Sequence, residues 1–380
     1  MDNDYLHELI REVQAREGGI VLNVQGKTEA VVLSIDRYNE LLRQLSAQTP
    51  ETAPKHRVLV TGGAGYIGSH VVRQLIAAGH QVVIIDNLST GKESNVPDQA
   101  LLVQGDIRDT SLVRQVLMKY DIDVVFHLAA SIEVEESTRF PIEYLDNNTL
   151  ATESLLRVMT ECGVNKLIFS STAAVYGEPE TVPIPESALT QPNNPYGYSK
   201  LLAEHLIHYY CESKGLQAVV LRYFNACGTD FDGQIQDPHN SHLIPVVMEV
   251  IAGTKPTLTI NGNDYQTFDG TCVRDYVHVL DIARAHVNAL LKLPQLGFFN
   301  VYNIGTSHGF SVQQVVQAAA EVTGHMIPLE VGLRRAGDAP ATVADNKKIQ
   351  TELGFELLHS DLETIIQTSW NSIKKNVPLF

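Results

Sequence analysis

Short apolar runs alternate with helix-length segments along most of this chain. The runs rich in Val, Ile and Leu are residues 57–60, 81–85, 101–103, 123–127, 166–170, 218–223 and 301–304. Segments long enough for a helix separate several of them. This alternation predicts an α/β fold in which helices cover both faces of a parallel, doubly wound sheet.

Two stretches break this rhythm and divide the chain. Residues 234–271 are rich in Asn, Asp, Gly, Pro and Thr, which indicates a smaller lobe late in the chain. Pro50 and Pro54, with no large apolar residue near them, mark a linker. Before it, β-rich runs at 20–23 and 30–35 predict a hairpin, and a helix follows Asp36. We expect a small α+β appendage (1–48), a linker (49–56) and a main domain (57–380), whose sheet lies mainly in 57–225 and whose smaller C-terminal lobe lies mainly in 226–275 and 306–373.

Composition and charge limit the possible partners. With 44% hydrophobic and 19% charged residues, the chain has enough apolar side chains for a globular core. Its 28 basic and 44 acidic residues give a net charge of −16, which disfavours nucleic acid and anionic membranes as partners. The four cysteines are widely spaced and lack clustered histidines, so we expect no metal site. Without a signal peptide or a membrane-spanning apolar run, the sequence predicts a cytoplasmic protein.

The first strand of the main domain leads into a glycine-rich turn and then a helical pattern. Gly62 permits a tight turn, Gly65 lets the backbone approach a pyrophosphate, and Gly68 allows close packing of the helix. Asp86 ends the next strand, 24 residues after Gly62, where a carboxylate accepts ribose hydroxyls. No arginine in residues 87–90 offers a partner for a 2′-phosphate. The pattern predicts a Rossmann-type site for NAD rather than NADP.

Polar and small residues also follow later strands of the predicted sheet. Ligands of doubly wound sheets bind at the carboxyl ends of the strands. Candidate cofactor contacts at these ends are Asp106, Ile107, Ala129 and Ala130.

A candidate for proton transfer lies further along the chain. Tyr196 and Lys200 are four residues apart, which places them on one face of a helix. A phenol is a poor base at neutral pH, but a nearby ammonium group stabilises its phenolate. The strand before them ends in Ser170-Ser171-Thr172, whose hydroxyls could hydrogen-bond a sugar hydroxyl or ketone. Together these residues indicate a dehydrogenase-like site.

Taken together, these motifs resemble the extended short-chain dehydrogenase/reductases, and among them the UDP-glucose 4-epimerase family. The likeness covers residues 57–373 and rests on the glycine turn, Asp86, Thr172 and the Tyr196/Lys200 pair. Further stretches similar to that family are 146–148, 170–177, 221–225, 261–265, 269–271, 274–279 and 335–338.

This resemblance implies a function and a set of site residues. It implies a 4-epimerase that retains NAD, removes a hydride from C4 of a UDP-sugar and returns it to the opposite face. The implied catalytic residues are Tyr196, Lys200 and Thr172. The implied cofactor contacts are Gly62, Gly65, Tyr66, Ile67, Gly68, Asp86, Asn87, Asp106, Ile107, Ala129, Ala130, Asn147, Lys200 and Tyr223. The implied substrate contacts are Thr172, Tyr196, Asn225, His242, Leu243, Asn261, Arg274, Arg335, Asp338 and Thr342. Members of the family form homodimers, for which helices at 112–119 and 149–162 are the candidates here, although their leucines could equally face the sheet.

Several positions separate this chain from related enzymes. Sugar-nucleotide 4,6-dehydratases carry an acidic pair where this chain has Ala173-Ala174, so elimination lacks an acid and a base. Thr342 stands where some epimerases have a tyrosine that limits the sugar pocket, so N-acetylhexosamine nucleotides could also fit. Thr172 replaces a common serine, Ile132 a lysine, and Asn261 an aromatic residue.

Two alternative functions stay open at this point. A UDP-xylose or UDP-glucuronate 4-epimerase would use the same hydride chemistry. An NAD-sensing regulatory protein is a poorer hypothesis, because such a protein could dispense with Tyr196 and Lys200.

The appendage has a resemblance of its own. Residues 20–45 resemble the N-terminal part of a Phd/YefM-type antitoxin, a dimerising DNA-binding family. However, residues 1–56 hold six basic and nine acidic side chains, a balance of −3 that disfavours DNA binding. We therefore expect an appendage for dimerisation or an inherited fusion.

Overall fold

The computed structural model describes residues 20–24, 27–32, 54–235, 237–238, 241–335 and 338–374. The chain divides into two compact units, Met1–Pro54 and Lys55–Phe380. In the first unit, strands β1 (Ile20–Val24) and β2 (Lys27–Val32) pair antiparallel, as expected for a hairpin. The helix predicted after Asp36 lies outside the described residues.

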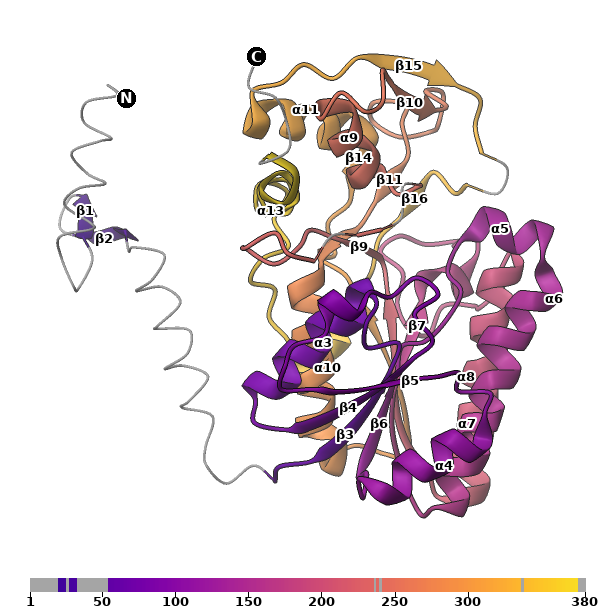
Figure 1. Cartoon of the computed structure of the whole chain (residues 1–380). Coiled ribbons are helices and arrows are strands. Elements are labelled where there is room, and N and C mark those ends of the chain that lie inside the picture. Colours follow the sequence, from indigo (N-terminus) through magenta and orange to yellow (C-terminus); the bar gives the residue numbers. More distant parts are fainter. Residues whose placement is uncertain are drawn as a thin grey trace. The chain divides into compact units, whose positions relative to one another are not determined.

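A seven-stranded parallel sheet forms the centre of the second unit (Figure 1). The strand order is β13-β8-β7-β6-β3-β4-β5, so the winding direction reverses between β3 and β6. Every strand coincides with one of the apolar runs identified in the sequence, to within two residues at each end, and the predicted doubly wound α/β fold is confirmed. The strands are β3 (Arg57–Thr61), β4 (Gln81–Asp86), β5 (Leu101–Gln104), β6 (Val124–His127), β7 (Lys166–Thr172), β8 (Gln217–Tyr223) and β13 (Phe299–Ile304).

Helices cover both faces of this sheet, on opposite sides in Figure 1. Side chains alternate between the faces, so Val58 and Val60 pack into one core while Leu59 packs into the other. The first face carries α3 (Tyr66–Ala77) and α10 (Val279–Lys292). The second face carries α4 (Thr110–Lys119), α7 (Ala151–Glu161) and α8 (Pro195–Lys214). Shorter helices are η1 (Glu93–Asn95), α5 (Val134–Arg139), α6 (Pro141–Tyr144), the π-helix η2 (Leu145–Leu150), η3 (Ala173–Tyr176) and η4 (Leu293–Gln295).

A smaller lobe continues beyond the carboxyl ends of the sheet strands (Figure 1). Its apolar core lies among helices α9 (Leu243–Ile251), α11 (Val312–Thr323) and α13 (Leu362–Ile373). Its small sheets are β9 (Asn225–Cys227) with β12 (Tyr276–His278), β10 (Leu258–Asn261) with β15 (Leu329–Gly332), and β14 (Phe310–Ser311) with β11 (Val273–Arg274) and β16 (Ala341–Thr342). Helix α12 (Lys347–Leu353) falls in the range predicted for the lobe, but Ile349 and Leu353 pack into the sheet core.

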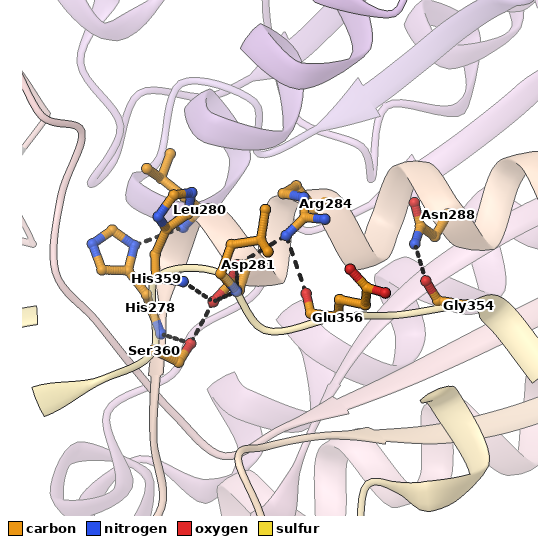
Figure 2. A network of polar contacts seen from close by, with 10 residues as sticks. His278, Leu280, Asp281, Arg284, Asn288, Gly354, Glu356, His359 and Ser360 are labelled. Atoms are coloured by element: carbon orange, nitrogen blue, oxygen red, sulfur yellow. Dashed lines mark hydrogen bonds and ion pairs between the residues drawn. The ribbon is translucent and has the colours of Figure 1, made fainter. Parts of the chain in front are cut away.

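A buried carboxylate joins the lobe to the sheet. Figure 2 shows Asp281, near the start of α10, facing the segment that leads to α13. Its carboxylate accepts hydrogen bonds from the His359 amide at 2.9 Å and the Ser360 hydroxyl at 2.7 Å. Arg284 lies 3.3 Å from the same carboxylate. Because Asp281 is fully buried, these partners compensate for the loss of water around its charge.

His278 precedes this carboxylate and caps α10. Its Nδ1 accepts a hydrogen bond from the Leu280 amide at 3.1 Å, and its Nε2 lies 3.1 Å from the Thr368 hydroxyl. Burial, with contributions from His359 and His70, lowers the pKa of His278 from 6.5 to about 3. The unfolded chain therefore takes up this proton first as the pH falls. The stability associated with neutral His278 is complete above pH 6.5 and is lost as the pH falls toward 3.

A substitution that keeps the cap and removes the proton site tests this coupling. His278→Asn retains an acceptor for the Leu280 amide, so we expect the variant to fold. Its unfolding free energy should depend less on pH between pH 6 and 4, by up to about 1.4 kcal/mol per pH unit. Urea unfolding at several pH values measures this slope. The exposed His205, changed to Asn, is the control and should keep the wild-type slope. Equal slopes for wild type and His278→Asn would contradict the coupling.

None of the helices within the described ranges is long and apolar enough to cross a membrane. Those ranges also contain no group of three or more His, Cys, Asp or Glu side chains placed to hold a metal ion.

Candidate active site

The glycine-rich turn between β3 and α3 forms a cradle for an anion. Gly62 has a φ of +73°, a conformation that favours glycine. A Cβ on Gly68 would lie 2.0 Å from the Gly62 carbonyl oxygen, so only glycine permits this contact of helix and turn. The N-cap of α3 is Gly65, and no side chain caps the helix. The amides at this helix start are therefore suited to a pyrophosphate, and the turn fits the dinucleotide expected there.

Two of the predicted cofactor residues at this helix start have side chains that pack into the protein. The Tyr66 hydroxyl donates to the Gly228 carbonyl at 2.5 Å, and Ile67 packs against the core. Only the backbone of these residues is thus suited to a phosphate. Ile107 is similar, because its side chain is buried in the core on the other face of the sheet.

Asp86 ends β4 and holds the glycine-rich turn in place. Its two carboxylate oxygens accept hydrogen bonds from the amides of Ala64 at 2.9 Å and Leu88 at 2.8 Å. Each oxygen keeps a further lone pair, so the carboxylate could also accept ribose hydroxyls. The predicted role of Asp86 is compatible with this geometry.

The next strand end carries Asp106, which is paired rather than isolated. Arg108 donates to both of its oxygens, at 2.9 Å and 2.6 Å, and Arg108 with Asn87 lowers the Asp106 pKa. This guanidinium is therefore already engaged by a carboxylate. That pairing agrees with a site that lacks a partner for a 2′-phosphate.

The loop after β6, which carries Ala129 and Ala130, is fastened to the helices beside it. Asn148 in η2 accepts from the Ser131 amide at 2.8 Å and donates to the Ser131 carbonyl at 2.9 Å and the Ser199 hydroxyl at 2.9 Å. Asn147 donates to the Ser131 hydroxyl at 3.1 Å. The network links this loop to the helix that carries the predicted catalytic pair.

The predicted proton-transfer residues meet where β7 ends and α8 begins. Thr172 is the last residue of β7, and Tyr196 lies in the first turn of α8, which Asn194 caps through the Gly197 amide. Burial raises the pKa of Tyr196 to about 12, the carboxylate of Glu133 adds to this, and a hydrogen bond with Thr172 opposes it. The structure therefore brings Thr172 and Tyr196 together.

Lys200 lies one turn further along α8 and is only 3% exposed. Its Nζ stands 4.2 Å from the centre of the Phe169 ring, a cation–π contact. Burial lowers the pKa of Lys200 to about 7, while the Glu204 carboxylate acts in the opposite direction. The Lys200 side chain, one turn after Tyr196, therefore titrates near neutral pH.

The structure gives the three hydroxyl residues at the end of β7 different partners. Successive side chains of a strand point to opposite faces. The Ser170 hydroxyl lies 3.2 Å from His286 Nε2, and the Ser171 hydroxyl donates to Glu204. Thr172 alone of the three is directed to the tyrosine. The predicted cofactor residue Tyr223 also places its hydroxyl 3.1 Å from His286 Nε2.

Three of the predicted substrate residues form a cluster in the lobe. Arg274 on β11 is the register partner of Thr342 on β16. Its Nη2 lies 3.3 Å from the Asp338 carboxylate, and its Nη1 donates to the Val273 and Ala339 carbonyls, each at 2.9 Å. The guanidinium is therefore held in one orientation, as a phosphate contact requires.

The remaining predicted substrate residues are more dispersed. Asn225 pairs with Tyr276, two residues after Arg274 in the chain. His242 is the N-cap of α9, just before Leu243, and its Nδ1 lies 2.8 Å from Asp237. Burial, with a contribution from Arg335, lowers the His242 pKa, but the Asp237 carboxylate outweighs both and the pKa is raised. Asn261 ends β10, and no described contact joins it to the arginines.

Comparison with known proteins adds an independent finding. The model of the NAD dependent epimerase/dehydratase family matches residues 58–305. The chain belongs to this family. A UDP-glucose 4-epimerase of Halalkalibacterium halodurans is 47% identical over 321 residues, which cover 84% of this chain and 96% of that protein.

Solved structures of other epimerases agree with this epimerase/dehydratase assignment. UDP-glucose 4-epimerase from Brucella ovis, in complex with NAD, is 44% identical with a TM-score of 0.80, covering 83% of this chain and 97% of that one. The UDP-Glc/GlcNAc 4-epimerase from Campylobacter jejuni is 39% identical with a TM-score of 0.75, covering 84% of this chain and 99% of that one.

Sequence reasoning missed some residues that shape the site of this epimerase/dehydratase family member. Asn148 falls in the stretch 146–148 that resembles the epimerases, but its role as the link between Ser131 and Ser199 depends on a fold in which distant loops meet. Glu133 influences Tyr196 and His242, and nothing distinguishes it from other acidic residues in the sequence. Ser199, which lies between Tyr196 and Lys200, is the sequence signal that could have indicated the contact with Asn148.

Proposed function

We propose that this protein interconverts UDP-glucose and UDP-galactose as an NAD-dependent 4-epimerase. The observation that carries the proposal is that Thr172, at the end of β7, neighbours Tyr196, one turn before the buried Lys200 on α8, at the same sheet edge as the dinucleotide cradle. The relatives that match over nearly their whole length are UDP-glucose 4-epimerases. Elimination, as in a dehydratase, has no acid–base pair at Ala173-Ala174.

The residues of the sheet edge would hold NAD. The amides at the start of α3 would bind its pyrophosphate, and Asp86 the adenosine ribose. Lys200 would hold the nicotinamide ribose, with Asn147 and Tyr223 nearby. When bound, NAD supplies a hydride acceptor for C4 and a positive charge beside the tyrosine.

Tyr196 would take the proton from the sugar 4-hydroxyl. It would return the proton after the 4-keto sugar has rotated to present its opposite face. Because burial raises the pKa of Tyr196 to about 12, little of it is phenolate near neutral pH, so positive charge in its surroundings is needed to stabilise the phenolate. Thr172 would bond the same oxygen and orient it. The uridine diphosphate would stay anchored throughout by Arg274 and Arg335, with Asn225 and Asp338 on ribose or sugar hydroxyls.

Incubation with a panel of UDP-sugars tests the function. Purified protein without added NAD is mixed with UDP-glucose, UDP-galactose, UDP-xylose or UDP-glucuronate, and NMR follows the configuration at C4. We expect conversion of the two hexoses. Turnover confined to the xylose or glucuronate form would replace the proposed substrate, and no turnover of any sugar would refute the epimerase function.

Thr342 should determine whether N-acetylated sugars are accepted. It sits beside Arg274 in the lobe, and a threonine leaves more room than a tyrosine. We expect Thr342→Tyr to reduce turnover of UDP-N-acetylglucosamine by about 10-fold or more. UDP-glucose is the control within the same variant and should still react. Unchanged rates on both sugars would remove Thr342 from the list of specificity residues.

We also propose a homodimer built through α4 and α7. The exposed faces near these helices carry Met118, 69% exposed, and Leu150, 56% exposed, whereas Leu155 and Leu156 belong to the sheet core. Sedimentation of the purified chain measures its mass.

The four cysteines, all within the described ranges, form no disulfide, which supports a reducing compartment such as the cytoplasm.

A further inference from the structure

A buried ion pair lies behind the catalytic residues, on the face of the sheet that α8 covers. Glu204 is 2% exposed and Arg222 is 6% exposed. Arg222 donates through Nε and Nη2 to the two carboxylate oxygens of Glu204, at 3.1 Å and 2.5 Å. Neither residue is among those proposed above to contact the substrate or NAD.

This ion pair forms hydrogen bonds with the chain on both sides of Thr172. Immediately before it, Ser171 donates its hydroxyl to Glu204 Oε1. After it, the single turn η3 leads to Tyr176, whose hydroxyl accepts from Arg222 Nη1 at 3.0 Å. The Tyr176 hydroxyl in turn donates to Asn303 on β13 at 2.7 Å. The segment that carries Thr172 is therefore anchored at two points to one ion pair.

One member of the pair, Glu204, lies on α8, the helix that carries Tyr196, whereas Arg222 lies on β8. Glu204 lies one turn after Lys200 and two turns after Tyr196 on α8. At the start of that helix, a Cβ on Gly197 would lie 2.6 Å from the Ala174 carbonyl oxygen, so helix and η3 touch backbone to backbone. Two contacts of α8, at Gly197 and at Glu204, thus determine the distance between Thr172 and Tyr196.

Energetics favour a geometric role for this pair over a purely stabilising one. Removing two charges from water costs several kcal/mol per ion, and apolar residues of similar volume often stabilise a core equally well. Here each nitrogen of Arg222 and each carboxylate oxygen of Glu204 has at least one partner, in Ser171, Tyr176 or the other member of the pair. A fully bonded network of this kind has one arrangement, which is what a site with fixed distances needs.

We propose that Glu204 and Arg222 are positioning residues for the epimerase reaction, which hold the Thr172 hydroxyl against the Tyr196 phenol. The inference rests on the proposed function. The network also sets the charge near the site, where the groups facing Lys200 or Tyr196 are Glu204 on α8, His127 on β6, Glu133 before α5 and Tyr223 on β8.

Glu204→Gln tests both consequences, since glutamine keeps the size and an acceptor for Arg222. We expect kcat to fall by about 10- to 100-fold through misplacement of the reacting groups, with little change in KM for UDP-glucose. The charge of Arg222 would then be unbalanced, which lowers the pKa of both Lys200 and Tyr196. Both limbs of the pH profile of kcat should therefore move to lower pH.

Asp281→Asn is the matched control. Asp281 is also a fully buried carboxylate with an arginine partner, and Figure 2 shows it at the lobe end of α10. Its neutralisation should destabilise the protein but leave kcat per folded molecule and the pH profile as in wild type. A loss of activity that merely follows stability would appear in both variants.

Ser171→Ala probes the same network with a smaller change that is expected to fold. We expect Ser171→Ala to lower kcat by about 3- to 10-fold, and Ser171→Thr to keep much of the wild-type kcat. In the double variant Ser171→Ala/Glu204→Gln, the activation free-energy change should be smaller than the sum of the two single changes. Ser369→Ala is its control, because that buried hydroxyl donates to the Ile365 carbonyl within α13.

The outcomes separate this inference from the proposed function. Wild-type protein that fails to interconvert UDP-glucose and UDP-galactose refutes the function itself. An active wild type whose Ser171→Ala variant keeps the full kcat, or whose Glu204→Gln variant folds and keeps the wild-type kcat and pH profile, refutes the positioning role alone. Reduced kcat with the shifted profile in Glu204→Gln, and wild-type behaviour in Asp281→Asn, supports it.

Discussion

Tyr196→Phe should lower the kcat for interconversion of UDP-glucose and UDP-galactose by between about 100-fold and 10,000-fold. The substitution removes one oxygen, the group proposed to exchange a proton with the sugar 4-hydroxyl. The ring itself stays, so its edge-on contact with Tyr144, at 6.5 Å between ring centres, is retained. We therefore expect the variant to fold and to keep its NAD. NMR of the C4 epimers measures turnover, and absorbance of the heat-released cofactor measures NAD content.

Tyr198→Phe is the matched control for this variant. Tyr198 lies two residues further along the same helix and is 49% exposed, so it faces away from the site. Its loss of a hydroxyl should leave kcat close to wild type. Comparable activity in Tyr196→Phe and Tyr198→Phe would mean that the phenol of Tyr196 transfers no proton, and the proposed mechanism would have to be abandoned.

Gly68→Ala should destabilise the protein and release NAD. The added methyl would lie 2.0 Å from the Gly62 carbonyl oxygen, a backbone atom that moves only if the whole turn moves. We expect the free energy of unfolding to fall by about 3 kcal/mol. The same displacement would pull the amides of the helix start away from the pyrophosphate. Urea unfolding and NAD content of the purified protein measure the two effects.

Gly297→Ala is the control for the glycine substitution. A Cβ at Gly297 meets no atom within 4 Å, so alanine should change the unfolding free energy by less than about 0.5 kcal/mol. NAD content should equal that of wild type. If Gly68→Ala were as stable and as rich in NAD as Gly297→Ala, the close contact of helix and turn would not be required for binding.

The strands and the cofactor turn were predictable because each carries its signal locally. A strand buried on both faces is a continuous apolar run, and all seven runs became neighbours in one sheet. Gly62 and Gly68 stand at fixed spacing between a strand and a helix, and the backbone geometry demands them there. The bounds were less exact, since β13 begins at Phe299, two residues before the apolar run at 301–304.

The roles of single polar side chains were not predictable in the same way. Ser170, Ser171 and Thr172 are equivalent in the sequence as three hydroxyl residues at a strand end. In the fold, the pleat directs the first to His286 on α10 and the second to Glu204 on α8. These partners lie 116 and 33 residues away along the chain, so no local pattern connects them.

By itself, the sequence of this protein determined the doubly wound α/β fold, the NAD cradle and the tyrosine–lysine pair. Each depends on apolar periodicity or on residue spacing within one turn, and both are local properties of the chain. Only the tertiary structure decided which hydroxyl faces the tyrosine, which arginine is already paired, and where Glu204 and Arg222 are buried. Those outcomes depend on which distant side chains meet in the core, because an isolated charge or hydroxyl there must find a partner.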